Sequence, residues 1–132
     1  MNDLQKIRKK VSTMNVLVVD DENAIREQAI IFMKKFCHNV DSAVNGEDAL
    51  NMINKNNNYD IVLTDIRMPK INGLELAEKI STMHKELFVA IMSGSCVLYD
   101  KVNSHCDLFL EKPINLHNMK AMLETVIRKK SL

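Results

Sequence analysis

The chain alternates short apolar runs, often β-branched, with segments whose apolar residues recur at helical spacing. The continuous run 16–19, Val-Leu-Val-Val, is typical of a strand buried on both faces of a parallel sheet. The same pattern predicts further strands at 39–44, 61–63, 88–92 and 108–110. Helices are predicted at 24–36, 47–54, 74–83 and 116–126, the last of them after Asn115 as N-cap. This order predicts an α/β fold, a doubly wound five-stranded parallel sheet with helices on both faces.

Length and composition limit the kind of protein to which this sheet can belong. The 132 residues suffice for one domain, and we expect no second domain such as a DNA-binding module. No apolar run approaches the ~20 residues of a membrane span, and residues 1–13 lack the apolar core of a signal peptide. Cys37, Cys96 and Cys106 are an odd number without metal-ligand spacing, which indicates reduced thiols and a cytoplasmic location.

The formal net charge of +1 conceals an uneven distribution along the chain. Basic side chains outnumber acidic ones by three in residues 1–13, and residues 128–130 add three more positive charges. The body, 14–127, has 11 basic and 16 acidic residues, a net charge of −5. We interpret the basic ends as aids to solubility and to the helix dipole rather than as a nucleic-acid or membrane site. Residues 1–13 are thus predicted to be a basic extension, and whether Leu4 and Ile7 form a docking helix or a frayed lead-in stays open.

Polar groups follow four of the predicted strands, namely Asp20-Asp21-Glu22, Thr64-Asp65, Ser93-Gly94-Ser95 and Glu111-Lys112-Pro113. Because ligands of doubly wound sheets bind outside the carboxyl ends of the strands, we expect these groups to meet at one rim. The carboxylates of Asp20, Asp21 and Asp65 would repel one another there unless a cation joined them. Hard oxygen ligands with open positions suit Mg²⁺. Helix capping and loop solvation would explain each acidic residue singly but not their convergence.

In this order the motifs resemble the receiver domain of two-component response regulators, a family of aspartate-phosphorylated switches. The resemblance covers about residues 14–130 and is strongest over 16–22 and 60–76, with further matches at 45–50 and at Lys112-Pro113. The separation of 44 residues between Asp21 and Asp65 also suits the family. The resemblance implies the flavodoxin-like strand order 2-1-3-4-5, which spacing alone does not give, and makes 14–132 the receiver domain.

The resemblance also assigns the residues that would carry the chemistry. Asp65 would be the phosphoacceptor, and Asp21, Asp65 and the backbone carbonyl of Arg67 would bind Mg²⁺ directly. Asp20 would act on the ion through water. Lys112 would pair with Asp65 and then, as a point charge, with the phosphoryl oxygens.

A second group of residues would carry the switch. The Ser93 hydroxyl would move to hydrogen-bond a phosphoryl oxygen, and Phe109 would rotate inward behind it. The Lys112-Pro113 peptide bond resembles the family's cis bond, which would aim the lysine at the pocket. Up to about two added negative charges would then repack the face made by the helix that the family has within 95–106, the fifth strand and the last helix.

Three departures from the family pattern limit the resemblance. The segment 95–106 is about one helical turn shorter than expected, so the helix that the family has in this segment is predicted to be short, irregular or mobile. Phe109 lacks the hydroxyl of a tyrosine, and plain core packing is its alternative role. We expect Arg67 to point at the pocket mouth and to influence the lifetime of phospho-Asp65, the alternative being a solvated loop arginine.

The sequence therefore predicts a switch that accepts a phosphoryl group from a histidine kinase or phosphorelay protein onto Asp65. It would signal to a downstream protein by surface contact, as a monomer or weak dimer, without direct nucleic-acid binding or membrane insertion. It would not be an enzyme beyond its own phosphotransfer and autodephosphorylation. One alternative is the receiver half of a DNA-binding response regulator. The other is an Mg²⁺-dependent aspartyl-phosphate phosphohydrolase, although the D-x-D signature of such enzymes is absent after the first strand.

Overall fold

The computed structural model describes residues 1–94 and 105–132 and contains a five-stranded parallel sheet in the order β2-β1-β3-β4-β5. The strands are β1 (Asn15–Val19), β2 (Asn39–Ala43), β3 (Ile61–Asp65), β4 (Phe88–Ser93) and β5 (Leu108–Glu111). The helices of the described residues are α1 (Asp3–Val11), α2 (Asn23–Lys34), α3 (Gly46–Lys55), α4 (Gly73–Met83) and α5 (Leu116–Lys129). The predicted doubly wound parallel sheet is confirmed, and so is its strand order.

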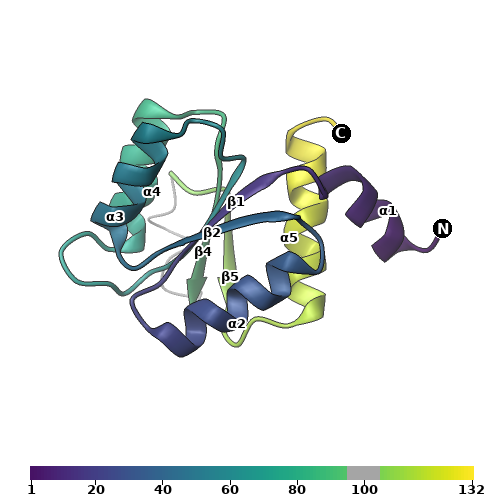
Figure 1. Ribbon diagram of the computed structural model, residues 1–132, viewed down its shortest axis with the longest axis horizontal. Coiled ribbons are helices and arrows are strands. Elements are labelled where there is room, and N and C mark those ends of the chain that lie inside the picture. The colour runs from purple at the N-terminus through teal and green to yellow at the C-terminus, as the bar shows by residue number, and fades with distance from the viewer. Residues whose placement is uncertain (95–104) are drawn as a thin grey trace.

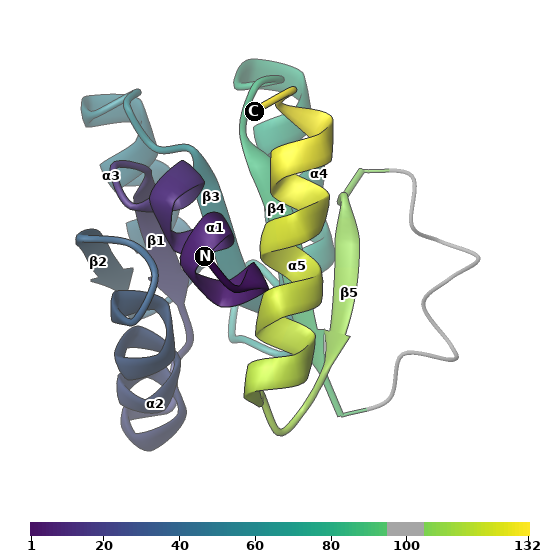
Figure 2. The same cartoon turned by 90° about the vertical axis from the view of Figure 1, so that its right-hand side faces the viewer.

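The helices form a layer on each face of the sheet, with α3 and α4 on one side and α1, α2 and α5 on the other (Figures 1 and 2). Each layer encloses its own apolar cluster. Ala49 and Ile53 of α3 pack with Leu76 and Ile80 of α4 in one of them. The other cluster joins α2 and α5 and includes the buried Met33. The central strands β3 and β4 are buried along their whole length, as their continuous apolar runs predict.

Asparagine caps place the starts of the helices that follow β2, β3 and β5. Asn45 accepts a hydrogen bond from the backbone N–H of Asp48 at the start of α3. Asn72 forms a capping box with Glu75 at the start of α4. Asn115 does the same with Asn118 at the start of α5, where the sequence predicts the cap. These caps satisfy N–H groups that a helix leaves without partners and so fix where each helix leaves the rim.

The N-terminal segment is a helix that docks on the rest of the fold. Asn2 and Gln5 form a capping box at the start of α1. Its apolar face inserts Ile7 and Val11 into the cluster shared by α2 and α5, and Val11 is 0% exposed. The Arg8 side chain reaches α2, where its Nε donates to the carbonyl oxygen of Lys35 at 2.7 Å. The basic segment therefore contributes to the core, which settles the question left open for Leu4 and Ile7.

Further predictions concern the segment 95–106, the cysteines and the absence of a membrane-spanning run. The segment 95–106, where a short or irregular helix is predicted, lies outside the described residues at 95–104, and so does Cys96. The Cys37 thiol is buried and free. Among the helices that the structure describes, none combines the length and the apolar character needed to cross a membrane.

The register of the strands aligns their carboxyl ends. Val19 pairs with Thr64, Asp65 pairs with Met92, and Ser93 pairs with Glu111. The residues that follow β1, end β3 and β4, and follow β5 consequently lie side by side along one edge of the sheet. This register brings the predicted site residues together from four separate parts of the sequence.

Candidate functional site

Three carboxylates lie together at the carboxyl edge of the sheet. Asp20 and Asp21 follow β1, and Asp65 is the last residue of the neighbouring strand β3. One oxygen atom from each of the three lies within 4.8 Å of the other two. Asp20 and Asp65 are buried whereas Asp21 is exposed, so solvent reaches the cluster at Asp21. Carboxylates this close repel one another, and the arrangement favours a bound cation.

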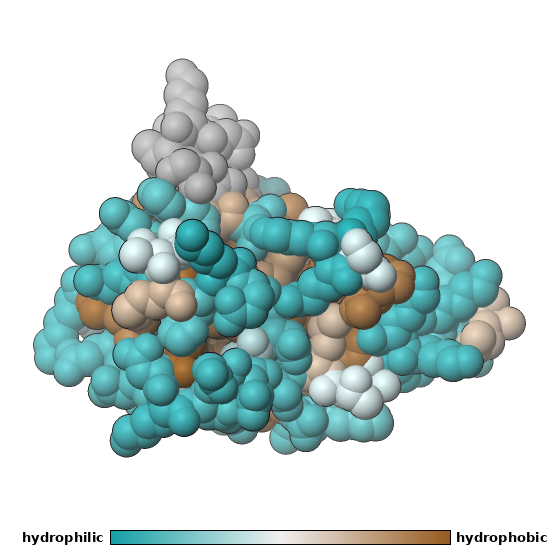
Figure 3. All heavy atoms as spheres, turned by 90° about the horizontal axis from the view of Figure 1, so that it is seen from above, coloured by the Kyte–Doolittle hydropathy of each residue, from teal (hydrophilic) through white to brown (hydrophobic). Residues whose placement is uncertain are grey.

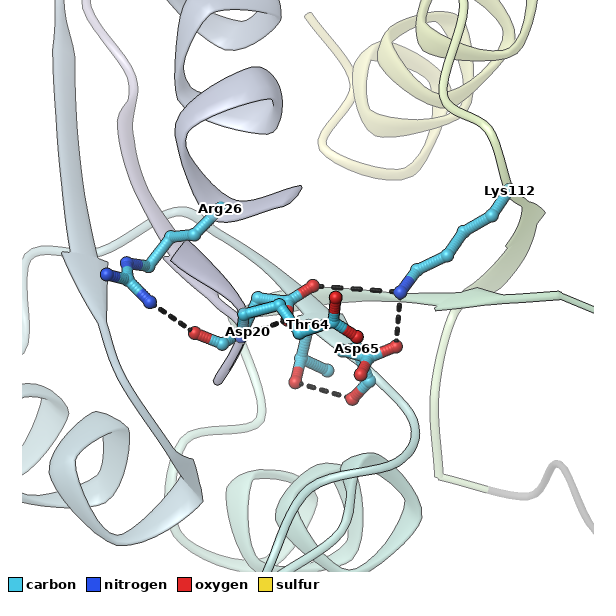
Figure 4. A network of polar contacts seen from close by, with 6 residues as sticks. Asp20, Arg26, Thr64, Asp65 and Lys112 are labelled. Carbon is cyan, nitrogen blue, oxygen red and sulfur yellow. Dashed lines mark hydrogen bonds and ion pairs between the residues drawn. The ribbon is translucent and has the colours of Figure 1, made fainter. Parts of the chain in front are cut away.

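Lys112 supplies a positive charge from the far side of the rim (Figure 4). Its Nζ lies 2.7 Å from Asp65 Oδ1 and 3.7 Å from Asp20 Oδ2. The backbone N–H of Lys112 donates to the carbonyl oxygen of Ser93 at 2.7 Å, which ties the end of β5 to the end of β4. The peptide bond between Lys112 and Pro113 is cis. Lys112 therefore contacts both buried carboxylates at once, and one lysine only partly balances three of them.

Asp20 is the most buried of the three carboxylates. Its side chain is 0% exposed; Oδ1 accepts a hydrogen bond from the N–H of Glu22 at 2.9 Å, while Oδ2 has no hydrogen-bond partner. Burial raises the pKa of the Asp20 carboxyl, and the charges of Asp65 and Asp21 raise it further, against the Glu22 hydrogen bond and Lys112. A buried anion with a spare oxygen beside two more carboxylates fits a hard divalent cation such as Mg²⁺.

The N-cap alternative for these acidic residues does not describe the structure. The N-cap of α2 is Glu22, and its side chain makes no capping hydrogen bond. Asp20 and Asp21 lie before that position and turn toward Asp65. Their common location reflects the cluster rather than the start of a helix.

Two contacts at the site, made by Arg26 and Thr64, were not anticipated from the sequence. The Arg26 guanidinium donates to the backbone carbonyl of Asp20 at 2.8 Å and also contacts the Asn23 side chain (Figure 4). The buried Thr64 hydroxyl donates to the carbonyl oxygen of Asp65 at 2.9 Å. Arg26 stands in the first turn of the helix after the Asp20 loop, but nothing in the sequence distinguishes it from a solvated helix arginine. Both contacts hold backbone that carries a carboxylate of the cluster.

Gly73 fixes the approach of α4 to the site. Its N–H donates to the carbonyl oxygen of Ile66 at 2.8 Å. A Cβ atom at position 73 would lie only 2.4 Å from the carbonyl oxygen of Asp65. Glycine is therefore required here by the close approach of two backbone segments. The first turn of α4 packs directly against the residue at the centre of the site.

The remaining predicted residues lie at different depths around the cluster. Ser93 ends β4 and is 2% exposed. Phe109, on β5, is half-buried and packs against the cluster of α3 and α4. Arg67, two residues after Asp65, has an exposed side chain. The structure thus gathers Asp20, Asp21, Asp65 and Lys112 with Ser93 beside them. The movements of Ser93 and Phe109 and the role of Arg67 stay predictions.

Known proteins share this sequence pattern. The sequence model of the response regulator receiver domain matches residues 16–124. The 3′,5′-cyclic-nucleotide phosphodiesterase regA of Dictyostelium discoideum is 37% identical over 124 residues, 89% of this chain and 16% of that protein. The transcriptional regulatory protein DltR of Streptococcus agalactiae is 31% identical over 122 residues, 90% of this chain and 54% of that protein. The chain thus spans about half of DltR and much less of regA.

Solved structures share the fold. The response regulator TrrA of Thermotoga maritima, determined in complex with Mg²⁺-BeF, is 32% identical and superposes with a TM-score of 0.77 over 86% of this chain and 99% of that one. The receiver domain of Saccharomyces cerevisiae Ssk1, crystallised with the histidine phosphotransfer protein Ypd1, is 22% identical and gives a TM-score of 0.79 over 92% and 94%. With the family model spanning most of its length, this chain belongs to the response regulator receiver domains of two-component systems, which are phosphorylation-dependent signalling switches.

Proposed function

We propose that Asp65 accepts a phosphoryl group from the phosphohistidine of a histidine kinase or phosphotransfer protein, and that the chain then signals by protein contact. The observation that carries this proposal is the buried Asp65 carboxylate, 2.7 Å from Lys112 and clustered with Asp20 and Asp21. A lysine and a cation on either side of one carboxylate are the groups that phosphoryl transfer needs. Such transfer is catalysed mainly by positioning and charge neutralisation.

The transfer itself uses few protein groups. A carboxylate oxygen of Asp65 attacks the phosphorus atom as the P–N bond of the donor breaks. The imidazole nitrogen keeps the electron pair of that bond and takes up a proton. Lys112 Nζ, already at Asp65, would then lie beside the phosphoryl oxygens and neutralise part of their charge.

Mg²⁺ would be held by Asp21, Asp65 and the backbone carbonyl of Arg67, with Asp20 acting through water. The ion, when bound, supplies positive charge at the phosphoryl oxygens. The orphaned Oδ2 of Asp20 supports this assignment, and so does the Mg²⁺-BeF complex of TrrA. Arg26 and Thr64 would keep the backbone of Asp20 and Asp65 in place as these charges change.

The added negative charge would act on the neighbouring strand ends. Ser93 ends β4 next to Asp65 and would hydrogen-bond a phosphoryl oxygen. Phe109 is half-buried, and rotation inward behind Ser93 would bury the rest of its ring. A partner that distinguishes the two arrangements of this face would receive the signal.

The domain boundary, the location and the partners are part of the same proposal. We assign residues 14–132 to the receiver domain and 1–13 to a basic N-terminal extension whose helix packs on it. The free, buried thiol of Cys37 supports a reducing, cytoplasmic compartment. The Ssk1–Ypd1 complex supports a histidine phosphotransfer protein as donor.

We propose that the only catalysis is the chain's own phosphotransfer and autodephosphorylation.

The half-length match to DltR supports a second candidate, in which this switch is the receiver part of a longer transcriptional regulator. The phosphorylation chemistry would be the same, and only the output would differ. A reading frame that continues into a DNA-binding domain would favour this candidate.

NMR spectroscopy with Mg²⁺ and beryllofluoride, a stable mimic of the acyl phosphate, tests the proposed switch. We expect Mg²⁺-dependent shifts around Asp20 and Asp65 first, and shifts at Ser93 and Phe109 only when beryllofluoride is added. The variant Asp65→Asn should keep the fold and lose the second set. Beryllofluoride shifts that persist in Asp65→Asn, or their absence from the natural sequence, would contradict the proposal.

A further inference from the structure

Two basic segments at opposite ends of the sequence lie together in the fold. Lys10 Nζ donates to the carbonyl oxygen of Leu132 at 3.3 Å, so the end of α1 meets the chain just after α5. Arg8 joins α1 to the end of α2 through its 2.7 Å hydrogen bond to Lys35 and lies 5.6 Å from the centroid of the Phe36 ring. Figures 1 and 2 show α1 beside α5 on one side of the sheet. The carboxyl ends of three helices therefore share one region.

We call this region the basic end and define it by its exposed cationic side chains, Lys6, Arg8, Lys9, Lys10, Lys34, Lys35 and Arg128. Two carboxylates lie among them. Asp3 is 3.6 Å from Lys120, and Glu124 stands one turn before Arg128 on α5. A groove of about 280 Å³ between α1 and α5 has Ile7 and Ile127 in its lining, together with members of the basic end. The region is thus strongly cationic with some apolar surface.

The basic end lies at the opposite edge of the sheet from Asp65. Strand β1 begins at Asn15, close to α1, and ends at Val19, next to Asp20. Five residues of strand span about 16 Å, roughly twice the screening length of about 8 Å at physiological salt. A charge added at Asp65 is therefore largely screened from the basic end.

The sequence alone favours a solubility role for the two basic segments, but the fold gathers them into one surface. We propose that the basic end therefore holds the protein at an anionic lipid surface, whatever the phosphorylation state of Asp65. Most of its cations are lysines, and the Arg8 guanidinium is engaged by Lys35 and Phe36. Basic residues near a membrane surface are each attracted to anionic headgroups by about 1 kcal/mol, a factor of about five in binding. Leu132, 49% exposed and in contact with Lys10, adds apolar surface that a bilayer interface accommodates.

Nucleic acid is the less suitable anionic partner for this surface. Single strands are bound largely by stacking on exposed aromatic rings, and no Phe or Tyr side chain of 1–94 or 105–132 is exposed. The surface in Figure 3, viewed toward the edge opposite the candidate site, is mainly hydrophilic with hydrophobic atoms scattered across it. A lysine-rich surface with scattered apolar atoms suits lipid headgroups better than bases.

Vesicle sedimentation tests the proposal with the full chain. We expect binding to phosphatidylcholine vesicles that contain phosphatidylserine, no binding to phosphatidylcholine alone, and release at high salt. Replacing Lys6, Lys9 and Lys10 by Gln should lower the partition coefficient about a hundredfold, at about fivefold for each cation. The matched control replaces three exposed lysines of the other layer, Lys55, Lys70 and Lys79, by Gln and should bind within about twofold of the natural sequence. Asp65→Asn should bind unchanged, which separates this inference from the proposed phosphorylation.

Three results would overturn the proposal. One is the absence of binding to phosphatidylserine vesicles at low salt. Another is an equal loss of binding in the control variant, which would mean that net charge alone acts. The third is displacement from vesicles by an equal charge concentration of duplex DNA, which would identify the basic end as a nucleic-acid site. Circular dichroism of both triple variants checks that they fold.

Discussion

Replacing Gly73 by Ala tests how closely α4 controls the site. At the start of an ordinary helix, alanine would stabilise the protein by up to about 1 kcal/mol relative to glycine. Here the new Cβ would lie 2.4 Å from the carbonyl oxygen of Asp65 and 2.9 Å from Ile66 Cα, whereas ordinary contacts begin at 3.4 Å. Either α4 or the end of β3 must move by about 1 Å to restore such a contact.

The displacement should make this substitution destabilising, although alanine in place of glycine usually stabilises a helix. We expect Gly73→Ala to lower the free energy of unfolding by about 1–3 kcal/mol, as overpacking commonly does. Since a shift of about 1 Å in a reacting group can cost roughly a hundredfold in rate, phosphorylation of Asp65 should slow by up to that factor. Urea denaturation followed by circular dichroism measures the first effect. Intact mass against time, with Mg²⁺ and a small phosphodonor, measures the second.

Gly94→Ala provides the matched control. A Cβ at position 94 would have no atom within 4 Å, so this variant should be as stable as the natural protein or slightly more stable. If Gly73→Ala were as stable as Gly94→Ala and were phosphorylated at the natural rate, the close contact between α4 and Asp65 would have no functional consequence. The reasoning from that contact would then be refuted.

Three further substitutions test other parts of the site and fold. Because burial raises the pKa of Asp20, the folded state holds that proton more tightly than the unfolded chain. Without Mg²⁺, stability should therefore fall as pH rises from the unfolded value of 3.8 through the raised folded pKa. Asp20→Asn should remove this part of the fall in stability. If the urea stabilities of Asp20→Asn and the natural protein changed with pH in parallel, the prediction would be contradicted. Val11→Ala should cost about 1–3 kcal/mol in urea denaturation, whereas Lys9→Ala on the exposed face should cost little; equal stabilities would mean that α1 does not belong to the core. Arg67→Ala should shorten the lifetime of phospho-Asp65, and an unchanged autodephosphorylation rate would end that hypothesis.

Most of the sheet could be predicted because its central strands are apolar on both faces. The run 16–19 and the strands at 61–63 and 88–92 need no long-range information to be identified. The edge strand β2 is mostly exposed, and its polar sequence gives a weaker pattern. The observed ends of the elements differ from the predicted ones by one to three residues, as at α2, which stops at Lys34 before the chain turns Phe36 into the core. These ends depend on tertiary packing that a local pattern does not contain.

The candidate site could be predicted because parallel strands end at a common edge. Asp20, Asp65 and Lys112 follow from that rule, and their proximity required only the right strand order. The contact of Arg26 with the Asp20 carbonyl could not be predicted, because it depends on the angle at which α2 leaves the rim. Exposed charge on helices usually reports only solvation, so Arg26 has no distinctive pattern in the sequence.

The packing of α1 against the rest of the fold could not be predicted from the sequence either. Leu4, Ile7 and Val11 recur at helical spacing, which is compatible with either a docked or a frayed helix. The outcome depends on the complementary surface formed by α2 and α5, which exists only after folding. The meeting of the two basic segments follows from this docking, and no local pattern connects Lys10 with Leu132.

The most direct measurement is the location of the phosphoryl group after incubation with Mg²⁺ and a small phosphodonor. Intact mass gives the stoichiometry, and peptide mapping after reduction of the acyl phosphate with borohydride gives the residue. We expect one phosphoryl group per chain, on Asp65, which does not form when Mg²⁺ is chelated before the donor is added and is absent from Asp65→Asn. Labelling of Asp65→Asn to the same extent, or a natural protein that stays unmodified with Mg²⁺ and donor in excess, would contradict the assignment of Asp65 as the phosphoacceptor.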